Sequence, residues 1–388
     1  MIPVNRCGAF GARKCCATRR ATWDAERTFL LDRRQFIATG LGLSAAALGG
    51  FPATGAAMTY DGAVTTSRTA LKAAPRDREL VRFATLAANS HNTQPWVFSA
   101  GGDEITIAPD FSRRCAAVDP DDHHLFVSLG CAAENLILAA SALGWRANPV
   151  IDGERIVIAL GQAPPDASTL ASAIPVRQCT RAAFDGRPAA PEALRRLESA
   201  CREPGVTALL MTERAAIAGV TEYVLEGNSS QMRDKAFMRE LVSWIRFNEA
   251  EALATMDGLF APASGNPALP SWLARPLLRL FFTESGENKK YRDQLASSAG
   301  VVVLAAERSD KPHWIAVGRA CQRFGLQATA LGLKYSFVNQ PVEVAALRQQ
   351  FAASLGLGER RCDIVMRFGT GPDLPKSLRR PPEQMMRP

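Results

Sequence analysis

Residues 126–144 read FVSLGCAAENLILAASALG, and residues 314–332 read WIAVGRACQRFGLQATALG. The two stretches align without a gap at an offset of 188 residues, and they share Gly130/Gly318 and Gly144/Gly332. Apolar residues recur at helical spacing in both, so each stretch predicts an amphipathic helix. Two matched glycines in such a pair favour an internal duplication over a chance match between alanine-rich helices.

Each repeated helix follows an apolar run that is typical of a strand, Ile105–Ala108 before the first and Val301–Ala306 before the second. The repeated unit is therefore a strand followed by a helix, and its small residues suggest that the helices pack closely. We predict an α+β fold of two fused copies of one unit, each with an antiparallel or mixed sheet flanked by helices. The two copies would form a dimer within a single polypeptide.

Other elements follow from local pattern. Asp119-Pro120 predicts a helix start, with Asp as N-cap and Pro in the first turn. We interpret His123 and His124 as part of an exposed capping turn, which is favoured over a metal site. Thr59–Arg68 is interpreted as a polar linker. The other predicted elements are helices at 76–88, 191–201 and 214–256, strands at 207–211 and 364–368, a strand beginning at Val97, and a hairpin at 151–160.

The first 57 residues predict an export signal. Arg33-Arg34-Gln35-Phe36-Ile37 precedes a short apolar run at 38–51 and then small residues. This order matches a secretory signal, and the paired arginines resemble a twin-arginine leader that is read by the Tat export machinery. The apolar run is too short and too rich in glycine for a membrane span. A periplasmic or other extracytoplasmic location follows from this interpretation.

The charge and the cysteine content exclude some classes of partner and site. Residues 1–57 hold eight Lys/Arg and three Asp/Glu, a charge of +5, which leaves +3 of the total +8 for the rest of the chain. The basic balance therefore does not imply a nucleic-acid partner. Six of the nine cysteines lie beyond residue 57, and none forms a CxxC pair or stands near a His at metal-ligand spacing. We expect buried thiols and no metal.

A polar loop, Ser90-His91-Asn92-Thr93-Gln94-Pro95-Trp96, lies between a helical segment and a strand. Packing does not require four hydrogen-bonding side chains in a row there, and such loops commonly bind ligands. A helix-to-strand connection that satisfies its own backbone groups is the alternative. A second region, residues 258–290, is an insert rich in Gly and Pro that resembles a lid. A peripheral membrane contact is its less favoured interpretation, because only Arg275 and Arg279 flank its apolar residues.

Three motifs together resemble the FMN-dependent nitroreductase family. They are the Ser90–Trp96 loop, the Leu-x-Ala-x-Ala-Leu-Gly helices, and Arg177-x-Cys179-x-Arg181. The tandem, exported form resembles the long single-chain subgroup related to the mycobacterial Acg protein. The resemblance covers most of residues 75–385. It implies that the loop lines the flavin and that the Arg177 segment holds the FMN phosphate, with Cys179 where the family usually has Ser.

The resemblance also suggests roles for individual residues. Fork-shaped guanidinium groups suit a phosphate dianion, and amide and hydroxyl groups suit the edge of the flavin ring. Asn339 and Gln340 fall where the family places groups near the flavin N5. The predicted FMN contacts are Ser90, Asn92, Gln94, Arg177, Cys179, Arg181, Asn339, Gln340, Arg379 and Arg380. No catalytic side chain is named, because the flavin carries the chemistry.

In the family the loop and the phosphate arginines come from different subunits. Here the loop occurs only in the first half, 58–170, and the arginines only in the second, 171–388. We therefore predict one composite FMN site per chain and a monomeric pseudo-dimer. The predicted activity is reduction of a small-molecule acceptor, such as a nitroaromatic or a quinone, with NAD(P)H as a possible donor. The alternative is a protein that binds or sequesters flavin without turnover.

Overall fold

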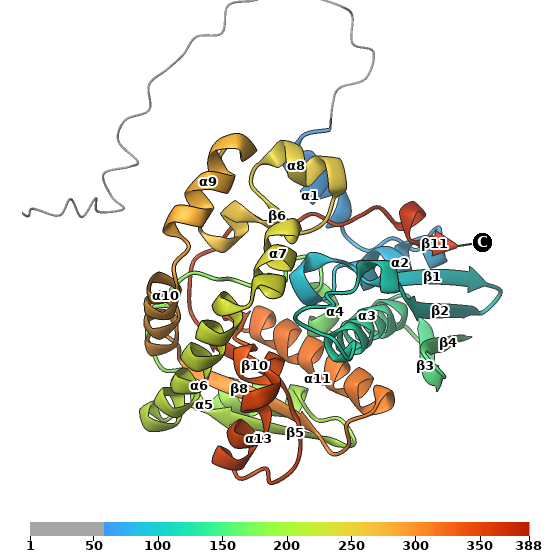
Figure 1. Cartoon of the computed structure of the whole chain (residues 1–388). Helices are drawn as coiled ribbons and strands as arrows, with labels where there is room; N and C mark the ends of the chain where they lie inside the picture. Colours follow the sequence, from blue (N-terminus) through green and yellow to red (C-terminus); the bar gives the residue numbers. More distant parts are fainter. Residues whose placement is uncertain (1–57, 388) are drawn as a thin grey trace, which may run out of the picture. The chain divides into compact units, whose positions relative to one another are not determined.

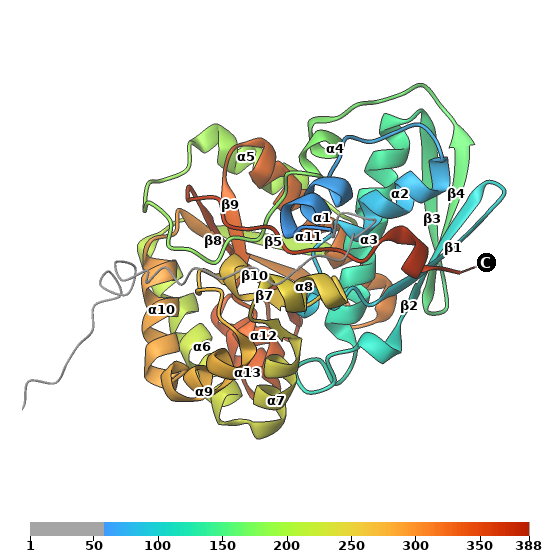
Figure 2. The same cartoon turned by 90° about the horizontal axis from the view of Figure 1, so that it is seen from above.

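The computed structural model describes residues 58–387. The predicted export signal, including Arg33 and Arg34, lies outside the described residues. Two sheets of the same topology organise the described part of the chain (Figure 2). The first sheet has the strand order β1-β2-β4-β3, and the second has the order β5-β8-β10-β9. All neighbouring strands within these two sets of four pair antiparallel.

The eight strands occupy equivalent positions in the two sheets. In chain order, those of the first sheet are β1 (Trp96–Gly101), β2 (Glu104–Pro109), β3 (Trp145–Asp152) and β4 (Arg155–Gln162); those of the second are β5 (Val206–Met211), β8 (Gly300–Ala306), β9 (Lys334–Phe337) and β10 (Cys362–Gly369). The two repeated helices, α3 (His123–Ala142) and α11 (Lys311–Ala330), each connect the second strand of a sheet to the third. The predicted α+β class and the predicted strands are confirmed.

The helices α3 and α11 cross in direct contact at Gly130 of α3 and Gly318 of α11. A Cβ atom on Gly130 would lie 2.1 Å from the Ile315 carbonyl oxygen, and one on Gly318 would lie 2.0 Å from the Val127 carbonyl oxygen. Ile315 is the counterpart of Val127 at the offset of 188 residues, so the two contacts are exchanged copies of each other. Only glycine permits this approach, which explains the small residues of the repeat.

A second exchanged contact lies further along the same crossing. Glu134 Oε2 forms an ion pair with Arg323 Nη1 at 2.9 Å. Gln322 Nε2 donates a hydrogen bond to Asn135 Oδ1 at 2.7 Å. Residues 322 and 323 are the counterparts of 134 and 135 at the offset of 188 residues. Glu134 therefore contacts the counterpart of Asn135, and Asn135 contacts the counterpart of Glu134. Within the described residues, α3 alone is long and apolar enough to cross a membrane, and it is mostly buried in this core.

The end of the chain joins the two halves. After β10, the C-terminal segment crosses to the first sheet, where β11 (Met386–Arg387) pairs parallel with β1 (Figure 1). Phe98 N donates to Met385 O at 2.8 Å. This crossing carries Arg379 and Arg380 from the second half to the loop that precedes β1.

The remaining elements cover the sheets and form the insert. They are α1 (Tyr60–Ser67), α2 (Arg76–Thr85), α4 (Thr169–Ala173), α5 (Pro191–Ala200), α6 (Arg214–Arg233), α7 (Lys235–Trp244), β6 (Ile245–Arg246), α8 (Glu249–Thr255), β7 (Leu259–Phe260), α9 (Ser271–Phe281), α10 (Glu284–Ala296), α12 (Gln340–Glu343), α13 (Ala345–Ser354) and short 3₁₀ turns at 90–92, 111–113, 261–264 and 382–384. The segment at 59–68, predicted as a linker, is mainly the helix α1.

The predicted long helix at 214–256 is wrong, because the structure divides it into α6, α7 and α8. Asp234 adopts an extended conformation, and its carboxylate accepts from Ala236 N and Phe237 N, which starts α7. Asn248 is likewise extended and accepts from Glu251 N to start α8. Both are residue types that favour N-cap positions.

The predicted exposed turn at His123 and His124 is also wrong. Both side chains are buried at the start of α3. His123 Nε2 lies 2.7 Å from Asp363 Oδ1, and His124 Nε2 lies 3.0 Å from the Asp363 carbonyl oxygen. The predicted N-cap is also displaced: α3 begins at His123 with Asp122 as N-cap, not after Asp119. The Asp119 carboxylate nevertheless accepts from the backbone N–H groups of His124 and Leu125 in the first turn.

Candidate functional site

A small cavity lies where the two halves, the insert and the C-terminal crossing meet. Its volume is about 80 Å³, well below the roughly 300–1,000 Å³ typical of small-molecule pockets. Five cationic side chains line it, and they come from three separate stretches of the chain: Arg68, Arg177, Arg181, Lys376 and Arg379. None of the lining residues is an Asp or Glu.

Half of the predicted site residues line this cavity, and they come from both halves of the chain: Asn92, Arg177, Cys179, Arg181 and Arg379. The loop after α2 supplies Asn92, the segment after α4 supplies residues 177–181, and the C-terminal crossing supplies Arg379. The structure therefore brings together residues that lie almost 300 positions apart in the sequence.

Hydrogen bonds to protein oxygens hold the buried arginines in place. Arg177 Nη1 donates to the Tyr335 hydroxyl at 2.6 Å, and its Nη2 donates to Leu86 O at 2.7 Å. Arg379 Nε donates to Thr85 O at 2.7 Å. These partners are neutral, so they orient the guanidinium groups without cancelling their charge. A charged group that is buried without a counter-ion is unfavourable unless a ligand supplies the opposite charge.

Arg68 and Lys376 are site residues that the sequence reasoning missed. Arg68 follows α1, and its Nη1 donates to Pro175 O at 2.8 Å. Lys376 Nζ donates to Val176 O at 2.7 Å. Both side chains therefore hold the backbone just before Arg177. The only local signal is the presence of basic residues in polar segments, which by itself indicates a solvated surface.

The cavity is strongly positive. In the part of the chain that the structure describes, none of its five cations forms an ion pair. Burial, reinforced by the charge of Arg177, lowers the pKa of Arg68 to about 9. Burial and then the charge of Arg68 lower the pKa of Lys376 to about 8. Burial also moves the pKa of Arg379 well below its ordinary value. Repulsion between neighbouring cations contributes to all three shifts after burial, and a bound anion would relieve that repulsion.

Several buried polar atoms of the cavity lack a hydrogen-bond partner within residues 58–387. They include Nε of Arg68, Nε of Arg177 and Oδ1 of Asn92. Buried polar groups in proteins are nearly always satisfied, and exceptions commonly mark a binding function. The two guanidinium nitrogens are donors, and the amide oxygen is an acceptor. The residues present therefore fit a ligand with an anionic group and a hydrogen-bond donor.

The insert is bonded directly to the loop. Asn92 Nδ2 donates to Gly258 O at 3.0 Å and to Leu378 O at 3.1 Å, and Gly258 N donates to Asn92 O at 3.1 Å. Further along the insert, Ser264 Oγ accepts from Arg181 Nη1 at 3.0 Å. These contacts place the insert over the cavity and account for its small volume.

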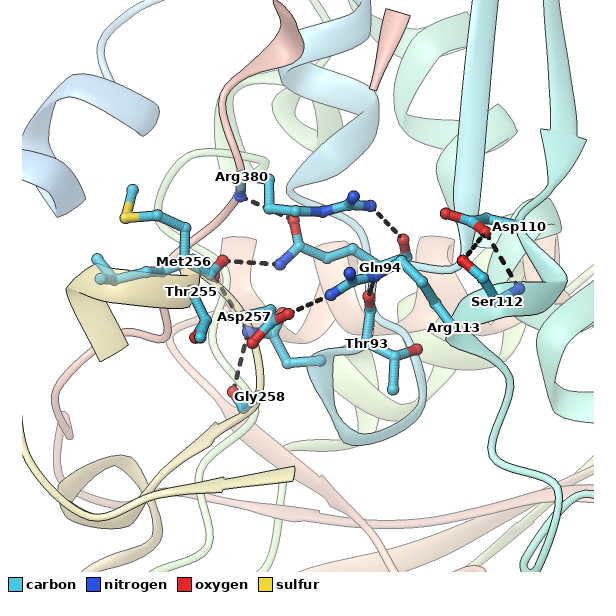
Figure 3. Close-up of polar contacts among 12 residues, drawn as sticks. Thr93, Gln94, Asp110, Ser112, Arg113, Thr255, Met256, Asp257, Gly258 and Arg380 are labelled. Carbon is cyan, nitrogen blue, oxygen red and sulfur yellow. Dashed lines mark hydrogen bonds and ion pairs between the residues drawn. The ribbon is translucent and has the colours of Figure 1, made fainter. Parts of the chain in front are cut away.

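Gln94 is not among the residues that line the cavity, and its side chain lies between Met256 and Arg380 (Figure 3). Its Nε2 donates to Met256 O at 2.9 Å, and its Oε1 accepts from Arg380 N at 2.8 Å. Arg380 Nη2 donates a hydrogen bond to Gln94 O at 2.7 Å. Nearby, Arg113 donates to Thr93 O and pairs with Asp257 of the insert. Gln94 and Arg380 thus connect the loop to the insert and the C-terminal crossing.

Three other predicted contacts also lie outside the cavity lining. Ser90 O accepts from Thr93 N at 2.9 Å within the turn. Asn339 Oδ1 accepts from Val365 N at 2.9 Å, which attaches the segment after β9 to β10. Gln340 is buried beside Gly227 of α6, and its Oε1 has no partner within residues 58–387. Their roles as cofactor contacts remain predictions.

The backbone of the loop is in an uncommon conformation. His91, Asn92 and Gln94 have φ values of 47°, 55° and 55°, and they are three of five non-glycine residues with positive φ in the described part of the chain. Such conformations are costly and tend to persist at functional sites. The loop is fixed by Trp96, which is fully buried in the main core, and by the bonds of Asn92 and Gln94.

The fold and the cavity define an α+β protein with a closed, cationic site between two similar sheets. No family model matches the chain. Two sequences from Mycobacterium tuberculosis, strains H37Rv and CDC 1551, are each 26% identical over 339 residues, covering 80% of this chain and 90% of the relative. Both relatives are named as candidate NAD(P)H nitroreductases. The resemblance to nitroreductases that the motifs predict is thereby confirmed.

Solved structures give a similar but weaker match. An FMN-dependent nitroreductase of Mycobacterium smegmatis, in complex with NADPH, is 15% identical with a TM-score of 0.35, over 53% of this chain and 89% of that one. A nitroreductase-like protein of Bacillus cereus is 13% identical with a TM-score of 0.34, over 58% of this chain and 98% of that one.

Proposed function

We propose that the chain is an FMN-dependent oxidoreductase of nitroreductase type. It would reduce a nitroaromatic, a quinone or a similar acceptor, with NAD(P)H as the donor. The observation that carries this proposal is the cluster of five cavity-lining cations, which form no ion pair within residues 58–387. Three of them are predicted phosphate arginines, and two of those, Arg177 and Arg379, are buried. The nitroreductase names of the two M. tuberculosis relatives give it independent support.

Different residues of the chain would bind the phosphate and the ring of FMN. Arg177, Arg181 and Arg379 would hold the phosphate dianion, and Arg68 would add its unpartnered Nε to the same group. Asn92 Oδ1, also without a partner, would accept from an N–H of the flavin ring. FMN, when bound, supplies hydride and electron transfer. The insert would exclude water from the ring.

We further propose that the site is composite and single. The loop with Asn92 belongs to the half at 58–170, and the arginine segment belongs to the half at 171–388. The equal strand orders and the exchanged contacts of Gly130 and Gly318 support a tandem pseudo-dimer. The strand β5 stands at the position of β1 in the second half, yet its approach lacks the Asn, Gln and Trp of the loop. A second flavin would therefore lack the loop residues that are proposed to contact its ring.

A flavin-sequestering protein without turnover is the second candidate. The observation in its favour is the insert, which is bonded to Asn92 and leaves a cavity of about 80 Å³. FMN is itself larger than this cavity, so the insert must move to admit it. Sequestration requires that movement once, whereas turnover requires an opening for every acceptor.

The absorption spectrum of the purified protein, alone and with added FMN, tests both candidates. The oxidoreductase proposal expects about one FMN per chain, with a colour that NADPH or dithionite bleaches and a nitro compound restores. A flavin that dithionite reduces but no acceptor reoxidises would favour sequestration. A protein that ignores added FMN would overturn both, and two flavins per chain would overturn the composite site.

Export through the Tat machinery is proposed as well, on the basis of Arg33 and Arg34. Replacing both arginines by lysine keeps the charge of the leader and removes the twin-arginine feature. The variant should accumulate in the cytoplasm, whereas the parent protein should appear in the periplasmic fraction. Equal distribution of the two proteins would contradict the proposal.

A further inference from the structure

The helix α9 lies in the middle of the insert (Figure 1), and it exposes an apolar face with two positive charges. Seven large hydrophobic side chains are exposed in the described part of the chain, and three belong to this helix. Trp272 is 77% exposed, Leu280 66% and Phe281 71%. A cluster of this kind on one helix is unusual for the free surface of a protein and commonly marks a contact surface.

Helical spacing places Trp272 and Leu280 on one side. Positions 272, 276 and 280 are four residues apart and therefore lie along one face. They carry Trp272, Pro276 and Leu280, and all three are exposed. On the opposite side Ala274 is buried against the protein, so the exposed face points outward. Phe281 follows Trp272 by nine residues, so it is exposed at the end of the helix but not on this face.

Two exposed arginines border this face. Arg275 and Arg279 follow Trp272 by three and seven residues, so they lie beside it on the helix surface. The helix sequence SWLARPLLRLF contains no acidic residue. Neither arginine forms an ion pair with any residue in the range 58–387. The charge of the face is thus wholly positive and is not neutralised from within the described protein.

We propose that α9 docks on the surface of an anionic lipid membrane. Trp and Leu beside arginines form the combination that lies in the headgroup region, where the apolar side chains enter the acyl boundary and the guanidinium groups meet phosphates. The helix has 11 residues, which is too short to span a bilayer but suits an orientation in its plane. An acidic lipid surface fits the uncompensated charge better than a second copy of this face, which would place like charges together.

Flotation of the purified full chain with lipid vesicles tests the proposal. Vesicles of phosphatidylcholine mixed with phosphatidylglycerol should bind the protein, and those of phosphatidylcholine alone should bind it less. The double variant Trp272→Ala/Leu280→Ala should lower the partition coefficient at least ~10-fold, since each side chain loses its transfer from water. The variant Arg275→Gln/Arg279→Gln should lose most of the preference for anionic vesicles and the sensitivity to salt.

Val150→Ala is the matched control, because Val150 is 63% exposed on β3 and lies outside the insert. Its binding should equal that of the parent protein. Equal binding by the parent and the Trp272→Ala/Leu280→Ala variant would overturn the proposal and assign vesicle binding to another segment, such as the apolar run at 38–51. A dimer that forms at increasing concentration, is lost in the same variant and does not bind vesicles would overturn it in favour of a second copy.

Discussion

Replacement of Gly318 by alanine is the most direct test of the crossing between α3 and α11. The new Cβ would lie 2.0 Å from the Val127 carbonyl oxygen, about 1 Å inside the 3.0 Å limit that real Cβ contacts respect. The contacting atoms are backbone on both helices, so no side chain can rotate away. The helices must separate, and their partners across the crossing must follow.

The expected cost combines three contributions. Overpacking of a close contact costs about 1–3 kcal/mol. Separation would also lengthen the buried bonds Glu134–Arg323 and Asn135–Gln322, now 2.9 and 2.7 Å, at about 1 kcal/mol each. Alanine in place of glycine within a helix returns about 1 kcal/mol. The net loss of stability is about 2–4 kcal/mol, which should lower the melting temperature by roughly 3–6 °C.

Differential scanning calorimetry of the full chain measures this loss. Gly219→Ala, in the exposed part of α6 where a Cβ meets nothing within 4 Å, is the matched control. It should leave the melting temperature unchanged or raise it slightly. Gly130→Ala should behave like Gly318→Ala, because its Cβ meets the exchanged contact on Ile315. A Gly318→Ala protein with the same melting temperature as the Gly219→Ala protein would refute the close contact between α3 and α11.

Three further outcomes are expected from the site. Arg177→Ala and Asn92→Ala should each weaken FMN binding by about 1–3 kcal/mol, measured by quenching of flavin fluorescence; normal affinity in both would contradict the placement of the cofactor. FMN affinity should fall as pH rises through about 8, because Lys376 has its pKa there and an anionic ligand needs the ammonium form, while the phosphate stays dianionic. Lys376→Gln should bind more weakly at pH 7 and lose most of that dependence, whereas an unchanged pH profile would remove Lys376 from the site. Gln94→Ala should cost about 1–3 kcal/mol of stability through its lost buried bonds to Met256 and Arg380, seen in thermal unfolding, and should affect FMN affinity less than Asn92→Ala does.

The repeated helices were the most predictable part of the fold. Their pattern combines a period of 3.6 with small residues, and both properties are local to the sequence. The structure adds what the pattern lacks, namely that Gly130 and Gly318 meet the carbonyl oxygens of exchanged partners. In contrast, the division of 214–256 depends on Asp234 and Asn248, two polar residues inside an otherwise helical region. Their preference for N-caps was visible but weaker than the apolar period around them.

Long-range contacts account for the rest of what the sequence did not reveal. His123 is buried because Asp363 of β10 lies 2.7 Å from its ring, and these residues are 240 positions apart. Arg68 becomes part of the site because α1 brings it beside Pro175 and Arg177. Gln94 was predicted as a flavin contact from the resemblance of its loop to that of nitroreductases. Its amide bonds with Met256 and Arg380, which no local pattern could indicate.

The asymmetry of the two halves gives the insert its place in the proposed function. A symmetric pair of these units would have two equivalent clefts, one on each side of the α3–α11 crossing. In this chain one cleft holds the loop with Asn92, the arginine segment and the C-terminal crossing. The insert bonds to the same loop through Gly258, and further along it presents α9 with Trp272 exposed. A ligand at the outer face of α9 and a ligand in the cavity would therefore act on one continuous segment, 258–281. The bonds of Asn92 with Gly258 and of Arg181 with Ser264 join this segment to the site, so either ligand would influence the other through these contacts.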